Sequence, residues 1–185
     1  MRKINLYSFC DSNKHGIRPI LKGIYHNNGF MTATDGYIVF SLKGEYTSEN
    51  EGKVVIKNGE VIDGLKYPDI DSLFEKYIIN EHDVAIPYEK FDEVFKGYED
   101  NLRKDKNFDA MWCSIKGKAY FSMKALTKFV KACNARDMKI YLTVNNLAND
   151  YICLIGKNDN GDRSLLMNVI IPNKNLPYTY IFNID

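Results

Sequence analysis

The sequence predicts an α+β fold in which antiparallel sheets carry a few amphipathic helices on one face. Glycine-containing turn pairs separate short runs of alternating apolar and polar residues, a pattern that indicates strands joined by tight turns. The chain has 13 Tyr and 10 Phe among its 185 residues, and aromatic residues favour sheets. Few segments have the spacing of an amphipathic helix. Many short strands with few helices are typical of this class.

The bulk composition narrows the class of protein further. The chain is 45% hydrophobic and 26% charged, and its length fits one domain or two small ones. Lys and Arg (25) nearly balance Asp and Glu (24), so nucleic-acid binding would require a local basic face or an assembly. No segment has the length of a membrane span, and the N-terminal apolar run is too short for a signal peptide. We expect a cytoplasmic protein without a membrane partner.

The first part of the chain predicts a strand and then a three-stranded meander. Residues 3–9 form the first strand, which the following polar cluster ends. Residues 18–43 contain two turn pairs, Asn28-Gly29 and Asp35-Gly36, which tolerate the positive φ that tight turns require. These pairs divide the segment into three antiparallel strands.

The next segment predicts a hairpin and a short helix. Residues 53–62 form the hairpin, with Asn58-Gly59 at its tip. Residues 67–78 form the short helix, which Asp69 or Asp71 caps.

Two longer amphipathic helices follow, one beginning at Pro87 and one capped by Ser122. The residues expected to face inward are Tyr88, Phe91, Val94, Phe95 and Tyr98 in the first helix and Ala125, Leu126, Phe129, Val130 and Cys133 in the second. Between the helices, the charged residues 97–109 indicate a loop, which is either an internal boundary or a mobile excursion. Residues 111–122 then form a hairpin with its turn at Lys116-Gly117.

The end of the chain predicts three strands and an edge strand. The strands lie at residues 139–144, 151–155 and 165–171, and the edge strand at residues 176–185. The second half is thus a strand, a helix and three strands, and the first half resembles the same unit without its helix. We therefore predict a single domain made of two halves, at about residues 1–47 and 110–172, with an inserted segment at about 48–109.

Two stretches carry a resemblance to a known family. The stretch "RPILKGIYHNNGFMTATDGYIV" resembles the bacterial replicative sliding clamp, the β subunit of DNA polymerase III. The matches are Arg18, Pro19, Leu21 and Gly23 to the family's Arg-Pro-x-Leu-x-Gly strand, and Ala33, Thr34, Asp35 and Gly36 to its Ala-Thr-Asp-Gly-His-Arg-Leu turn. The stretches "FSMKALTKFVKACNARDMKIYLTVNN" and "SLLMNVIIP" are similar to the close of the last clamp domain. The resemblance implies a DNA-clamp-like fold.

The chain also departs from the family pattern. Tyr37, Ile38 and Val39 stand where the family has His, Arg and Leu. Asn168 and Ile170 replace the Pro and Arg of the C-terminal segment. The chain is too short for three clamp domains, so a ring would require homo-oligomers that associate edge to edge.

The resemblance implies a groove that binds client peptides. In the clamp family the turn and the C-terminal strand line this groove. By position, its residues here are Thr34, Gly36, Tyr37, Ile38 and Val39 from the turn and Met167, Val169 and Ile171 from the closing strand. Gly lets a peptide approach the backbone, and Met and branched aliphatic side chains adapt to different apolar anchors. The alternative is that these residues face the core.

The resemblance also implies a DNA contact on the second long helix. Lys124, Lys128 and Lys131 are spaced at i, i+4 and i+7 and form one basic stripe. Clamp helices of this kind line the central hole and contact duplex phosphates without sequence preference, in a salt-dependent way. The alternative is a solvated surface of the helix.

No catalytic or metal-binding motif is found in the sequence. His15, His26 and His82 are isolated, and the four scattered cysteines indicate reduced thiols rather than zinc ligands or disulfides. Residues 158–162 predict a hairpin turn rather than a calcium loop. Trp112 is either a stacking platform or a buried residue. We expect neither an enzyme nor a cofactor.

These observations predict a non-enzymatic accessory protein of DNA replication or repair, of the sliding-clamp type. It would bind a partner peptide and, weakly, duplex DNA. Two alternatives stay open. One is a protein–protein docking domain that keeps the clamp fold without binding DNA. The other is a small-molecule-binding or enzymatic α+β domain whose site the sequence does not reveal.

Overall fold

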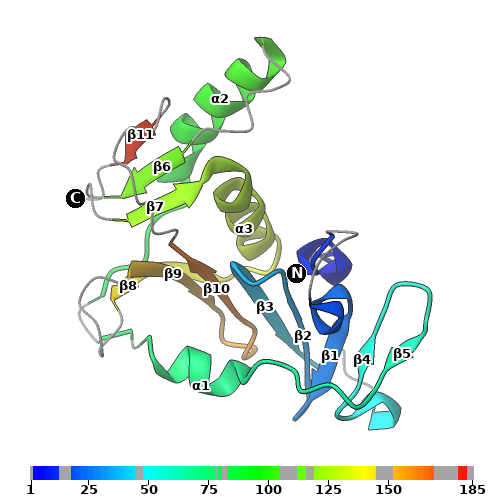
Figure 1. The fold of residues 1–185 in the computed structure, drawn as a ribbon. Coiled ribbons are helices and arrows are strands. Elements are labelled where there is room, and N and C mark those ends of the chain that lie inside the picture. The colour runs from blue at the N-terminus through cyan, green and yellow to red at the C-terminus, as the bar shows by residue number, and fades with distance from the viewer. Residues whose placement is uncertain are drawn as a thin grey trace.

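The computed structural model shows two sheets with helices packed around them (Figure 1). It describes residues 2–12, 18–44, 48–77, 79–80, 83–104, 112–115, 119–144, 152–168 and 179–182. The strands are β1 (Ile24–Asn27), β2 (Phe30–Thr34), β3 (Ile38–Lys43), β4 (Val54–Val55), β5 (Val61–Ile62), β6 (Trp112–Ile115), β7 (Ala119–Ser122), β8 (Lys139–Val144), β9 (Ile152–Lys157), β10 (Arg163–Met167) and β11 (Thr179–Phe182). The helices are α1 (Ile70–Glu75), α2 (Glu89–Lys104) and α3 (Met123–Ala135), with short 3-10 helices η1 (Leu6–Phe9), η2 (Pro19–Lys22) and η3 (Ser48–Asn50).

The larger sheet has eight strands in the order β5-β4-β1-β2-β3-β10-β9-β8, and all its neighbouring strands are antiparallel. The smaller sheet has the order β11-β6-β7, with β11 parallel to β6. The described residues therefore form a mixed α/β fold with mostly antiparallel sheets and few helices, as the sequence predicts.

The seam between β3 and β10 lies near the middle of the larger sheet. Leu165 pairs with Val39 and Leu166 with Ile38 across this seam. On one side the sheet continues through β2 to β1, and on the other through β9 to β8. Each side is thus a meander of three consecutive strands. The turn pairs within the first meander adopt the expected backbone, with φ of 51° at Asn28 and 95° at Gly36.

The predicted first strand at residues 3–9 is wrong. The 3-10 helix η1 lies there instead. The Oδ1 atom of Asn5 accepts a hydrogen bond from the N–H of Tyr7, and Ser8 Oγ donates to the carbonyl of Asn5. Short polar side chains that bond to the nearby backbone in this way compete with strand formation. The predicted strand at Arg18 likewise begins later, because η2 precedes β1.

The segment at about residues 48–109, which the sequence predicts as an insertion, contributes to both the sheet and the helical layers. β4 and β5 extend the larger sheet beyond β1. The helix α1 begins after the cap Asp69, one of the two predicted residues. The helix α2 continues to Lys104, through part of the predicted loop at residues 97–109. An exposed Asp100–Arg103 pair and a hydrogen bond from Asn101 Nδ2 to the Gly97 carbonyl accompany this continuation.

Helices cover both faces of the larger sheet, whereas the sequence placed them on one face. The side chains of Ile38, Phe40 and Leu166 belong to the apolar cluster that also contains α3, α2 and η1. Those of Val39 and Leu165 belong to a second cluster on the opposite face, together with residues of α1 and η2. Figure 1 shows α3 and α1 on opposite sides of β8, β9 and β10. No helix of the described residues is long and apolar enough to cross a membrane.

The C-terminal end of α3 is anchored to the turn between β9 and β10. Arg136 donates from Nε and Nη2 to Asp162 Oδ2 at 2.9 Å and 2.7 Å, and both side chains are buried. Asn158 Nδ2 bridges the Arg136 carbonyl and the same carboxylate oxygen. The acidic turn at residues 158–162 is therefore a structural hairpin turn, as predicted.

Candidate docking site

The turn between β2 and β3 is held by its own polar side chains. Asp35 Oδ1 accepts hydrogen bonds from the N–H groups of Tyr37 and Ile38, at 2.9 Å and 2.8 Å. Thr34 Oγ1 accepts from the N–H of Gly36 at 3.0 Å. Gly36 has the positive φ that favours glycine. The Asp35 carboxylate thus shapes the turn and needs no catalytic role to explain it.

The structure brings this turn beside the end of β10. The N–H of Met167 donates to the carbonyl of Tyr37 at 2.9 Å, directly after the ladder between β3 and β10. Gly36, Tyr37 and Met167 therefore share one end of the sheet. Val169 and Ile171, the other predicted residues of the closing strand, lie outside the described residues.

Only part of the predicted groove is accessible. Thr34, Ile38 and Val39 are buried, with at most 3% of each residue exposed. The cause is strand alternation, which directs Ile38 toward α3 and Val39 toward α1. These three residues are core residues in this structure, which is the alternative that the sequence left open. Tyr37, by contrast, is 57% exposed.

A cleft of about 340 Å³ lies next to the turn. Its walls come from the end of η1, from the turn and from the first half of α3. The lining residues are Ser8, Cys10, Asp11, Ser12, Asp35, Tyr37, Ile38, Ser122, Lys124, Ala125 and Lys128. The cleft thus joins the predicted turn to two lysines of the predicted basic stripe. Burial raises the pKa of the Cys10 thiol to about 12, so this thiol stays protonated and is a poor nucleophile.

The predicted phosphate-binding lysines Lys128 and Lys131 make contacts within the protein. Lys128 Nζ donates to the carbonyl of Ser8 and lies 4.4 Å from the centre of the Phe9 ring, and burial lowers the pKa of its ammonium group. Lys131 Nζ forms an ion pair of 2.9 Å with Glu99 on α2. The side chain of Lys124 is exposed. The three lysines therefore do not form one basic stripe that is available as a whole to bind phosphates.

The described residues contain no cluster of three or more His, Cys, Asp or Glu side chains that could hold a metal ion. His26 is buried in β1, and burial lowers its pKa. His15 and His82 lie outside the described residues. All four cysteines are buried free thiols, as expected for reduced residues. Trp112 is half-buried in β6.

A second surface, which no sequence pattern indicated, lies between the β1–β2 hairpin and the segment that leads into α1. A cleft of about 280 Å³ lies there, beside stacked rings of Tyr25 and Tyr67 whose centres are 4.4 Å apart. Arg163 of β10 lines this cleft and forms an ion pair with Asp71 of α1. Residues so far apart in the chain show no local pattern, so only the fold reveals the pair.

None of the protein-family models, curated proteins or solved structures with which the chain was compared matches it.

Proposed function

We propose that the protein is a non-enzymatic docking protein with a clamp-like sheet arrangement, which captures a short segment of a partner protein beside the β2–β3 turn. The observation that carries this proposal is the hydrogen bond from Met167 to Tyr37. It joins two stretches that resemble the peptide-binding elements of a sliding clamp. Tyr37 stands exposed at this junction, above the cleft next to α3. Exposed aromatic residues at clefts are frequent anchors of protein interfaces.

The topology supports the clamp-like part of the proposal. Two three-stranded meanders meet at the antiparallel seam of β3 and β10. The second meander follows β7 and α3 directly, which makes a strand, a helix and three strands in sequence. The resemblance to replicative clamps makes proteins of DNA replication or repair the first partners to test.

The contacts of α3 favour a protein partner over duplex DNA. Lys128 and Lys131 already bind Ser8 and Glu99, so a phosphate would have to compete with these contacts.

A ring of several copies is not part of the proposal. The outer edge of β8 carries a bridge between Ile86 and Ile140, and the opposite edge strand, β5, has only two residues. Neither edge offers a long uninterrupted strand to a second copy.

A random peptide library displayed on phage tests the proposal. Peptides are selected on the wild-type protein, and their affinities are then measured for wild type, Tyr37→Ala and Val84→Ala by fluorescence anisotropy. Val84 is 84% exposed, but it precedes α2 and does not line the cleft beside the turn, so it is the matched control for loss of an exposed apolar side chain. We expect Tyr37→Ala to weaken binding about tenfold or more, since truncated interface anchors cost this much.

The Val84→Ala protein should bind as wild type does. Selected peptides that bind Tyr37→Ala as tightly as wild type would show that the turn is not the docking site. A library that yields no binding peptide would refute a peptide-docking role.

A further inference from the structure

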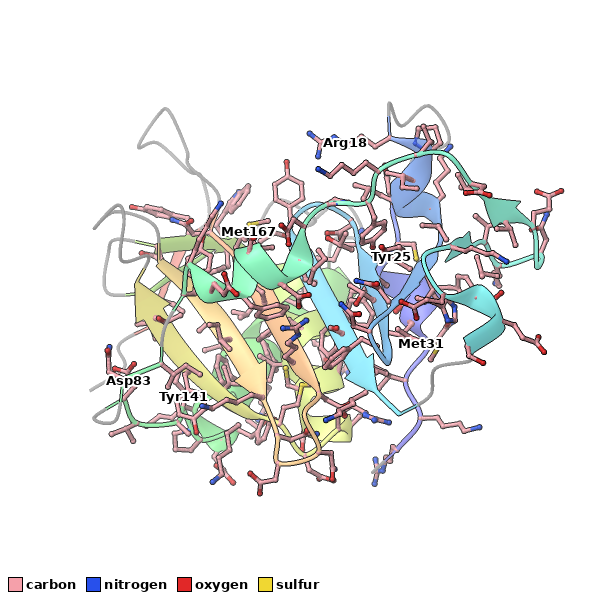
Figure 2. All side chains as sticks on the ribbon, turned by 90° about the horizontal axis from the view of Figure 1, so that it is seen from below. Arg18, Tyr25, Met31, Asp83, Tyr141 and Met167 are labelled. Carbon is pink, nitrogen blue, oxygen red and sulfur yellow. The ribbon has the colours of Figure 1, made fainter. Side chains whose placement is uncertain are left out.

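The helix α1 covers the face of the sheet to which Val39 and Met167 belong. Apolar side chains of β3, β9 and β10 form the floor of this face, and most of them are fully buried. They are Val39, Cys153, Ile155, Leu165 and Met167. The cover consists of partly buried side chains of α1 and the residues after it, which are Leu73, Phe74, Tyr77 and Ile79. Figure 2 shows α1 lying across the strands, with Met167 beside it.

A small set of contacts holds α1 in place. Asp69 caps the helix by accepting from the N–H of Ser72 at 3.0 Å and from its hydroxyl at 2.8 Å. Asp71 forms an ion pair with Arg163 of β10. The guanidinium group of Arg163 lies over two aromatic rings, 4.6 Å from the centre of Phe74 and 4.7 Å from that of Phe30. Arg163 therefore links α1 to the sheet through both charge and stacking.

The two helical covers of the sheet differ in how firmly they are attached. α1 has six residues, and only Ile70 among them is buried. α3 has thirteen residues, six of them buried, and the buried ion pair of Arg136 with Asp162 anchors its C-terminal end. A helix as short as α1 does not persist without its tertiary contacts. Segments with few buried contacts open locally at a lower free energy than the global unfolding of the protein.

We propose that α1 is a displaceable strap over the face of the sheet opposite α3, and that the docking partner carries an amphipathic helical segment with the chemistry of α1 itself. This inference rests on the proposed docking function. Met167 connects the two sites, because its N–H bonds to Tyr37 while its side chain belongs to the cluster beneath α1. A partner segment that takes the place of α1 would bring aromatic or aliphatic anchors for the floor and a carboxylate for Arg163.

Cys153 reports whether the strap opens. Its side chain lies in the floor of the face, and its exposure is 0%. Cys133 is a residue of α3 itself, in the core on the other side of the sheet, and is equally buried. A thiol reagent therefore reaches Cys153 through local opening of α1, but it reaches Cys133 only when α3 leaves the sheet. Mass spectrometry of digested protein separates the two alkylation rates in one sample.

The test compares wild type with Asp71→Asn, which removes the charge of the ion pair and keeps the shape of the side chain. We expect Cys153 to be alkylated about fivefold faster in this variant, as the loss of a partly exposed ion pair allows, while the rate of Cys133 stays the same. Asp100→Asn removes an exposed ion pair from α2 and is the matched control, with no change at either thiol. Rates that rise together, or a rate at Cys153 that does not rise, would overturn the inference.

A synthetic peptide with the sequence of residues 67–79 tests the chemistry of the partner. We expect it to bind Asp71→Asn about fivefold more tightly than wild type, because the weakened strap competes less. A peptide with Phe74→Ala should bind neither protein. Equal affinity of the unaltered peptide for both proteins, or no binding at all, would overturn the strap.

The two proposals fail in different ways. If Tyr37→Ala abolishes binding of the library peptides but Cys153 stays protected in Asp71→Asn, the docking function stands and the strap is wrong. If Cys153 opens selectively while Tyr37→Ala has no effect, α1 moves but the proposed docking function is wrong.

Discussion

Replacing Gly156 by Ala should destabilise the protein strongly, because α3 packs tightly on the sheet at this residue. A Cβ atom at Gly156 would lie 2.3 Å from Ser164 Oγ and 2.7 Å from Cys133 Sγ, with Met138 Sδ at 3.3 Å. All of these side chains are buried, so none can turn into solvent. Overpacking of this kind costs about 3 kcal/mol. With a slope of about 2 kcal/mol per molar urea, the unfolding midpoint should fall by about 1.5 M.

The matched control is the same change at Gly97, in the middle of α2. Nothing lies within 4 Å of a Cβ built there, and alanine is the better helix former, so Gly97→Ala should raise the free energy of unfolding by about 0.7 kcal/mol. Urea unfolding followed by circular dichroism measures both variants. In a Ser164→Ala background the penalty of Gly156→Ala should shrink by about 1 kcal/mol, because the nearest clashing atom is gone. A penalty for Gly156→Ala below about 1 kcal/mol, or one unchanged in that background, would refute the described packing of α3.

Two further outcomes follow from the charged and titratable groups. Wild type and Lys124→Glu should show equally weak binding to duplex DNA in fluorescence anisotropy, and Lys104→Glu, at the end of α2, is the control. A DNA affinity that falls steeply with salt in wild type and is lost only in Lys124→Glu would assign a DNA contact to α3. Burial lowers the pKa of His26 below its ordinary 6.5, so the unfolded chain binds this proton more readily and stability should fall as the pH drops from about 6.5 toward the folded pKa. Urea titrations across this range should show the slope in wild type and lose it in His26→Gln, and a slope that persists in the variant would assign it to another group.

Local chemistry explains which elements of the fold the sequence predicts well. The turns at Asn28-Gly29, Asp35-Gly36 and Asn58-Gly59 all have a glycine at positive φ. That requirement is met within two residues, so the turns can be found without knowing the rest of the fold. The cap of α1 at Asp69 is local in the same sense.

The errors have equally specific causes. At residues 3–9 an apolar pattern suggests a strand, but Asn5 and Ser8 bond to the neighbouring backbone and a 3-10 helix forms. Beyond Gly97, a highly charged stretch reads as a loop, although its charges can pair along the face of a continuing helix. In both places side-chain contacts, rather than hydrophobic periodicity, decide the local structure.

Sequence patterns could not predict which residues contact Lys128 and Arg163. Lys128 contacts Ser8 across 120 positions, and Arg163 pairs with Asp71 across 92. Such pairs depend on which helix the fold places against which strand. The periodic spacing of Lys124, Lys128 and Lys131 therefore predicts a shared helical face, but not whether that face is available to a ligand.

The resemblance to clamps predicts which residues are neighbours, but it does not predict which of them a partner can reach. Tyr37 and Met167 are neighbours, yet Val39 is buried because α1 lies over its face of the sheet. If α1 is a strap, the same floor must hold α1 and bind the partner. The apparent affinity for the partner is then the intrinsic affinity multiplied by the open fraction. Each contact that fastens α1, including the pair of Asp71 with Arg163, weakens partner binding by the factor by which it favours the closed state.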